Sequence, residues 1–162
     1  MLIEGVIGNL KEEDTKHSEK YKGKRIDYVD IEWYETHKKV QRKTTYSGVE
    51  VGFCFGDAIL VKGLKQDDVL YQGEQQIIAV NIPPCDALVI KVENHYLLPK
   101  VCYEIGNKHM PFFRGENKDE FVTPYDKPLQ VLINKLGIKT TREQVSFDFN
   151  KAISSNMGGH HH

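Results

Sequence analysis

The chain has 162 residues, of which 40% are hydrophobic and 28% are charged, so it can bury one sizeable core or two small ones. Its 22 lysines and arginines nearly balance 23 aspartates and glutamates, and a formal charge of -1 excludes an overall basic field for nucleic acid or an anionic membrane. No apolar run approaches the roughly 20 residues of a membrane helix, and the first residues lack a secretory pattern. We therefore expect a cytoplasmic protein with no membrane or nucleic-acid partner.

The first half of the chain predicts strands and turns. Segment 11–25 is rich in charge and predicts a solvated loop. After it, apolar and acidic residues alternate from Ile26 to Trp33, as in a half-buried strand. The alternation shifts by one residue between Tyr28 and Val29, which predicts a β-bulge at that point.

A hairpin is predicted next in the chain. Residues Val49, Val51, Phe53 and Phe55 repeat the alternation after a Ser-Gly turn signal, and their expected partner is the strand 40–45. A further strand is predicted at 77–82. These patterns indicate a mostly-β N-terminal unit.

Pro83-Pro84 predicts a domain boundary, because neither residue can donate a hydrogen bond to a sheet. We expect a β-rich domain at 1–83, a second domain at 84–150 and a flexible, histidine-ended tail at 151–162.

The elements predicted for the second domain are a strand at 88–90, a helix from about Leu98 to Ile105, strands at 112–113 and 121–122, a helix at 128–136 and a strand at 145–149. The order βαββαβ predicts a ferredoxin-like sheet with both helices on one face, and hence an α+β protein.

The cysteines give no sign of a disulfide framework or a zinc site. Cys54, Cys85 and Cys102 are odd in number and irregularly spaced. Cys102 lies in the apolar stripe of the predicted helix, which favours a small core residue over a nucleophile. The sequence also lacks phosphate-binding loops and hydrolase motifs, so we do not expect an enzyme.

One histidine follows the end of that helix. Gly106-Asn107 is predicted to adopt the left-handed cap that ends helices, which places His109 just beyond it and accessible to solvent. A lone histidine in this position is more often a surface residue than a metal ligand. Spacing alone therefore does not establish a metal site.

Several motifs together resemble the urease accessory protein E family over nearly the whole chain. They are the run Tyr103-Glu104-Ile105-Gly106-Asn107-Lys108-His109, the βαββαβ order around it, Thr123-Pro124-Tyr125-Asp126-Lys127-Pro128 and Asp30-Ile31-Glu32-Trp33. The resemblance implies a homodimeric nickel chaperone, with an N-terminal domain of peptide-binding type and a ferredoxin-like metal-binding domain.

The resemblance also implies the metal ligand. In the family, the histidine of a Gly-Asn-Arg-His motif meets its dimer mate and binds metal, and the matching residue is His109. Lys108 replaces the usual arginine and keeps the charge without a bidentate contact. Some relatives carry a second His-x-His pair soon afterwards, where this chain has Phe112, Phe113 and Arg114.

We thus expect Ni(II) to be delivered to apo-urease in a complex with the accessory GTPase, although Zn(II) or Cu(II) suits the same imidazoles. His160, His161 and His162 either complete the coordination shell, as the tails of several relatives do, or are the remnant of a purification tag. The alternative function is a protein-binding adaptor whose β domain engages partner peptides and whose metal binding is incidental.

Overall fold

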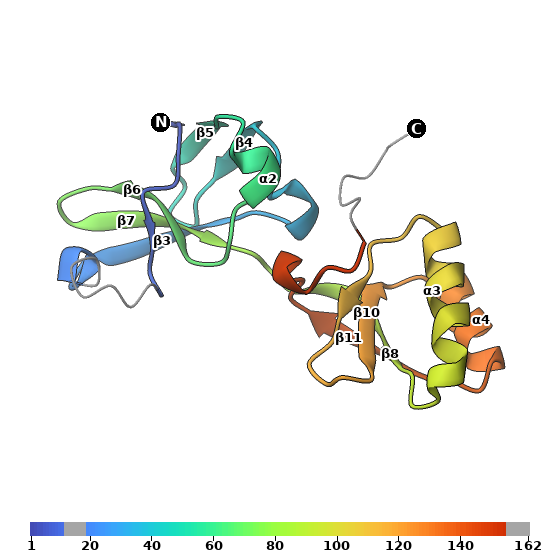
Figure 1. The fold of residues 1–162 in the computed structure, drawn as a ribbon. Helices are drawn as coiled ribbons and strands as arrows, with labels where there is room; N and C mark the ends of the chain where they lie inside the picture. The colour runs from blue at the N-terminus through green and yellow to red at the C-terminus, as the bar shows by residue number, and fades with distance from the viewer. Residues whose placement is uncertain (12–18, 155–162) are drawn as a thin grey trace. The chain divides into compact units, whose positions relative to one another are not determined.

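The computed structural model describes residues 1–11 and 19–154. The chain divides into two compact units, Met1–Pro83 and Pro84–His162. Strands dominate the first unit, and two longer helices, α3 and α4, belong to the second (Figure 1). None of the helices in the described residues has the length and hydropathy that crossing a lipid bilayer requires.

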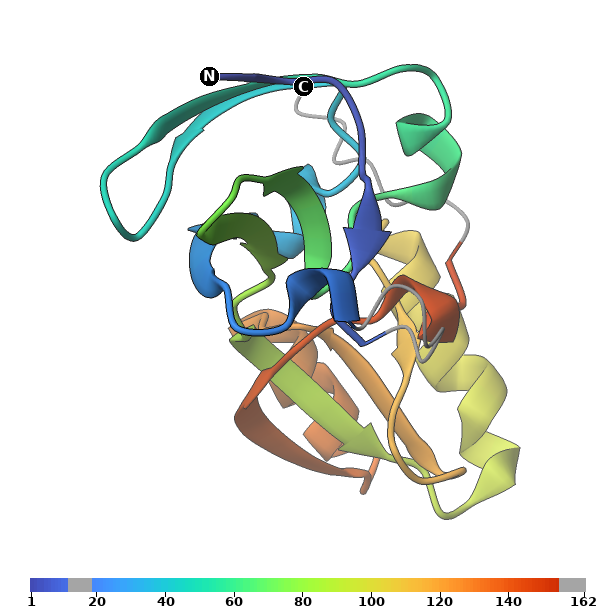
Figure 2. The ribbon, with the colours of Figure 1, turned by 90° about the vertical axis from the view of Figure 1, so that its left-hand side faces the viewer.

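The first unit contains two small sheets. The three-stranded sheet has the order β1-β5-β4 and consists of β1 (Leu2–Ile3), β5 (Glu50–Cys54) and β4 (Val40–Thr44). The four-stranded sheet has the order β2-β6-β7-β3 and consists of β2 (Gly8–Asn9), β6 (Asp68–Gln72), β7 (Gln76–Asn81) and β3 (Arg25–Asp30). Two short helices, η1 (Trp33–Glu35) and α2 (Ile59–Lys62), connect strands. The predicted hairpin is confirmed, because β4 and β5 pair antiparallel and form the teal two-stranded arm in Figure 2.

The β-bulge predicted at Tyr28-Val29 is wrong. Strand β3 pairs with β7 in unbroken parallel register. The sequence pattern shifts because one inward position of the strand holds a buried carboxylate and not an apolar residue. Asp27 is only 4% exposed, and its side chain accepts hydrogen bonds from the Ser47 amide at 3.0 Å and from the Ser47 hydroxyl. Burial raises the pKa of Asp27, but the hydrogen bonds outweigh it and leave the pKa below its ordinary value.

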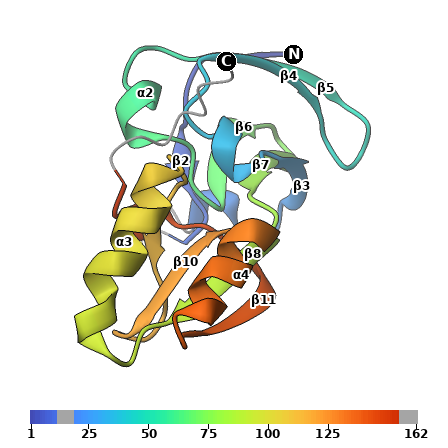
Figure 3. The ribbon, with the colours of Figure 1, turned by 90° about the vertical axis from the view of Figure 1, so that its right-hand side faces the viewer.

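The second unit is a four-stranded antiparallel sheet with α3 and α4 on one face (Figure 3). Its elements are β8 (Cys85–Lys91), η2 (His95–Leu97), α3 (Leu98–Asn107), β9 (Phe113–Arg114), β10 (Glu120–Pro124), α4 (Lys127–Lys135), β11 (Lys139–Val145) and η3 (Phe149–Lys151). The strand order β11-β8-β10-β9 is that of the ferredoxin-like fold. The predicted α+β class is confirmed.

Both helices begin and pack as the periodicity predicts. Pro99 and Pro128 fall in the first turn of their helices, where a missing N–H breaks no hydrogen bond. Gly137 ends the second helix with φ of 80°. The buried core between the helices and the sheet contains Leu88, Ile90, Val101, Ile105, Leu129 and Ile133.

The last strand was predicted at the wrong place. Strand β11 spans Lys139–Val145, whereas Phe147 lies beyond it and Phe149 begins η3. Both rings pack on Phe113, with centroid distances of 4.6 and 6.2 Å. Since β11 is an edge strand with mostly exposed polar residues, it lacks the apolar alternation that marks a strand in sequence.

Candidate metal site

His109 lies at the sharp corner that ends α3. The Met110 amide donates to the Ile105 carbonyl at 3.3 Å, and the His109 amide donates to the Gly106 carbonyl at 3.0 Å. These two bonds form a Schellman motif, in which the left-handed position normally belongs to glycine. Here that residue is His109, with φ of 55°, so the left-handed cap predicted at Gly106-Asn107 is displaced to the histidine itself.

The apolar core explains why the chain accepts this conformation at His109. The residue after a Schellman corner commonly packs against the last turn of the helix. Met110 does so, since it lies against the cluster that contains Ile105. Packing of this partly buried side chain favours the corner at His109, whose side chain remains exposed.

The loop after the corner is held by β10 and by the segment that connects β10 to α4. The Lys108 ammonium lies 2.9 Å from a carboxylate oxygen of Asp126, the N-cap residue of α4. The same oxygen accepts a hydrogen bond from the Leu129 amide at 3.3 Å. At the other end of the loop, the Pro111 carbonyl accepts a hydrogen bond of 2.8 Å from the buried hydroxyl of Thr123. Both ends of the His109 loop are thus attached to the body of the unit.

Within the described residues, one chain offers no complete metal site at His109. No group of three or more histidine, cysteine, aspartate or glutamate side chains gathers there or elsewhere in those residues. His95 begins η2, on the N-terminal side of α3, and lies 3.0 Å from Asp119. His160, His161 and His162 lie outside the described residues. A metal bound by His109 must therefore draw its remaining ligands from elsewhere.

The outer face of α3 leads to this histidine and carries no unpaired charge. Its Lys100 and Glu104 pair with each other at 2.9 Å. Beside that pair, the exposed residues of α3 are Pro99, Cys102, Tyr103, Gly106 and Asn107. Tyr103 is 67% exposed, and a side chain added at Gly106 would meet nothing within 4 Å. An exposed face that carries an aromatic side chain and no unpaired charge is suited to a protein contact.

The prediction that Cys102 belongs to the core is wrong. Val101 and Ile105 occupy the buried positions of α3, and Cys102 lies one residue further round the helix, where it is exposed. Desolvation still raises the pKa of its thiol, which favours the protonated form and argues against a nucleophile.

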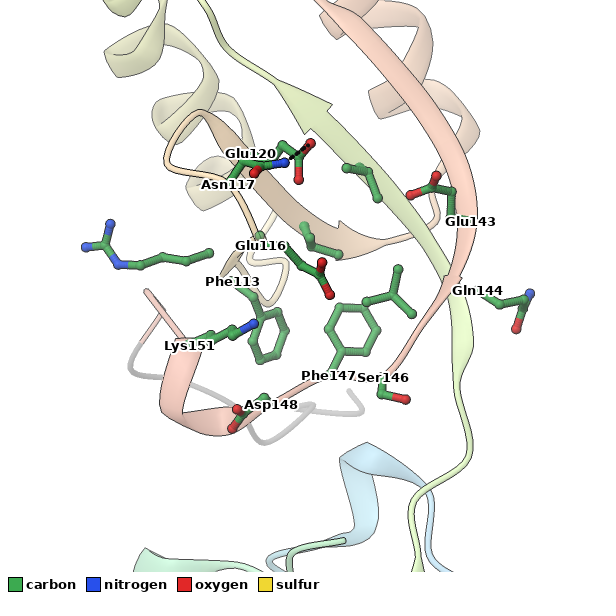
Figure 4. A pocket seen from close by; sticks show the side chains of 15 residues that line it. Phe113, Glu116, Asn117, Glu120, Glu143, Gln144, Ser146, Phe147, Asp148 and Lys151 are labelled. Atoms are coloured by element: carbon green, nitrogen blue, oxygen red, sulfur yellow. Dashed lines mark hydrogen bonds between the residues drawn. The ribbon is translucent and has the colours of Figure 1, made fainter.

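A separate hollow of about 660 Å³ lies on the sheet of the second unit, on the face that the helices leave open (Figure 4). Val89 and Val122 are among its lining residues, and the side chains of Glu116 and Phe147 reach into it. Its lining contains no histidine or cysteine. The hollow is therefore unsuited to bind a metal through imidazoles, and it does not include His109.

Comparisons with known proteins agree with this two-unit architecture. The models of the UreE urease accessory protein N-terminal and C-terminal domains match residues 3–83 and 86–162. A urease accessory protein UreE from Acetivibrio thermocellus is 38% identical over 162 residues, which cover 100% of this chain and 97% of the relative. The proteins of the same name from Helicobacter pylori strain P12 and Helicobacter acinonychis are 36% and 35% identical, and each comparison covers 97% of this chain and 88% of the relative.

Proposed function

Because the chain belongs to the UreE urease accessory protein family, we propose that it carries Ni(II) for urease maturation and holds the ion between the His109 imidazoles of two subunits. Its membership makes it an accessory protein of urease maturation and not an enzyme. The proposed setting is the cytoplasm, and the proposed recipients are apo-urease and the accessory GTPase that acts with it.

The observation that carries the proposal is the placement of His109. The imidazole is exposed at a fixed corner, and no group of three or more metal-binding side chains gathers there among the described residues. A two-fold axis near the corner would present two copies of the ring to one ion, so dimerisation itself supplies half of a four-coordinate shell. Without the second subunit, the site stays incomplete.

The outer face of α3 supports the dimer. Tyr103 and Gly106 place an exposed aromatic side chain and an open stretch of backbone on a surface that runs toward His109 and carries no unpaired charge. Aromatic residues are enriched where proteins associate, and glycine permits a close approach of two backbones. We propose that this face contacts its own copy in the partner subunit.

The ligand chemistry fits a cargo that must be released. Imidazole binds Ni(II), Cu(II) and Zn(II), and intrinsic affinity favours copper, so selection of nickel depends on geometry and supply. Two protein nitrogens leave positions for water or for side chains of the recipient protein. His160, His161 and His162 are further candidates for these positions, which a truncation can test.

Calorimetric titration of Ni(II) tests the proposal. The samples are wild type, His109→Ala and a variant truncated before His160. We expect one nickel per two chains in wild type, loss of this site in His109→Ala, and weaker binding with unchanged stoichiometry in the truncated protein if the tail contributes. Unchanged stoichiometry and affinity in His109→Ala would refute the proposal and favour the adaptor function.

A further inference from the structure

We propose that Asp126 and Thr123 are positioning residues for the nickel site, which fix the His109 loop without touching the metal. The inference rests on the proposed function, because it concerns the same site. It follows from two contacts that join the loop 108–111 to Thr123 near the end of β10 and to Asp126, the N-cap residue of α4.

The first contact is the ion pair of Lys108 and Asp126. Their atoms are 2.9 Å apart, and the side chains are only 34% and 27% exposed, so water screens the pair less than a fully exposed one. Asp126 is itself oriented by the Leu129 amide at the N-terminus of α4, where a carboxylate is favoured. The first turn of α4 thereby determines where the residue before His109 lies.

Asp126 also has an electrostatic role. Lys108 precedes His109 directly, and an unpaired ammonium next to a cation-binding imidazole would repel the metal. Pairing with Asp126 cancels this charge locally. Removing the carboxylate charge therefore weakens metal binding in two ways, through a looser loop and through an uncompensated cation.

The second contact is the hydrogen bond from Thr123 to the Pro111 carbonyl. Thr123 is fully buried, and the bond length is 2.8 Å. This bond fixes the backbone two residues after His109, as the ion pair fixes it one residue before. Between these points, the Schellman bonds and the packing of Met110 leave the His109 backbone little freedom.

Fixing the loop matters because chelation is shared by two copies. Each imidazole must be held in position by its own subunit, so the cost of a loosened loop enters the affinity twice. A threefold loss in each subunit becomes about a tenfold loss for the shared ion. We therefore expect the two anchors to affect nickel affinity more than they affect folding.

The test compares substitutions that preserve the local fold. Asp126→Asn keeps a helix-capping side chain, because asparagine caps as well as aspartate. Thr123→Val keeps the shape but removes the donor, and Thr123→Ser keeps the donor. The control is Asp148→Asn, which makes the same change at the N-cap of η3 in the same unit, where the carboxylate accepts its hydrogen bond from the Asn150 amide.

Nickel calorimetry should give about tenfold weaker binding for Asp126→Asn and Thr123→Val, with wild-type affinity for Thr123→Ser and Asp148→Asn. In the metal-free proteins, the amides of His109 and Met110 should exchange hydrogen faster in the two weakened variants, while core amides of the unit do not. Wild-type affinity and exchange in Asp126→Asn and Thr123→Val would overturn the inference and leave the proposed function intact. Failure of wild type to bind nickel would instead overturn the proposed function and the inference with it.

Discussion

Replacing His109 by glycine should separate metal binding from stability, because the strained backbone and the proposed metal ligand are the same residue. A left-handed conformation costs a side-chain-bearing residue roughly 1–2 kcal/mol, and the extra freedom of glycine in the unfolded chain costs about 0.5–1 kcal/mol. The imidazole is exposed, so its removal sacrifices little packing. We expect His109→Gly to stabilise the second unit by about 0.5–1 kcal/mol and to abolish the shared nickel site.

The assay must report on the second unit, because the single tryptophan, Trp33, lies in the first. Native-state hydrogen exchange of buried amides such as that of Ile133, in metal-free protein, provides this measure. His109→Ala retains the strain and should stay within about 0.5 kcal/mol of wild type. Both variants should lose nickel binding equally in calorimetric titration.

A matched control tests the same physics at the other helix. Gly137 has φ of 80°, and a side chain added there would meet no atom within 4 Å, so Gly137→Ala adds strain without a steric clash. It should destabilise the unit by roughly 1 kcal/mol and leave nickel binding intact. A destabilised His109→Gly, or one that keeps the nickel affinity of wild type, would refute the reasoning.

Three further predictions concern the dimer, the first unit and the core. Tyr103→Glu should dissociate the proposed dimer, as measured by light scattering, and weaken nickel binding in calorimetric titration. The control Val61→Glu, at a residue that is 83% exposed in the first unit, should change neither. A Tyr103→Glu protein that remains dimeric would contradict the proposed contact. Asp27→Asn should lower the free energy of unfolding by about 1–2 kcal/mol at pH 7. The difference should be full above about pH 4 and shrink as the pH falls further, because a carboxyl with a lowered pKa loses its contribution between its unfolded pKa and its lower folded pKa. Ile133→Ala, in the fully buried core, should cost about 2–5 kcal/mol in urea unfolding.

Periodicity predicted the elements whose side chains are buried on one face. The hairpin of β4 and β5, the start of α3 at Leu98 and the glycine end of α4 all carry strong local signals, and all are confirmed. It failed where a polar residue occupies a buried position, as Asp27 does, or where an edge strand is polar throughout, as β11 is. Neither situation produces an apolar alternation.

The site was predicted from resemblance, and its geometry came from the structure. The sequence suggested that glycine would take the left-handed position, whereas the packing of Met110 assigns it to His109. The anchors Asp126 and Thr123 lie more than ten residues away in sequence, and no local pattern connects them to the loop. Cys102 was placed in the core because three- and four-residue spacing does not resolve the edge of a buried helical face.

The most direct test of the account is X-ray absorption spectroscopy of nickel bound to protein truncated after Ser154. The absence of the tail leaves His109 as the proposed source of imidazole. The account predicts two imidazole nitrogens for each nickel and one nickel for every two chains, with both lost in His109→Ala. A spectrum with a single imidazole per nickel, or one that persists unchanged in His109→Ala, would contradict the shared site.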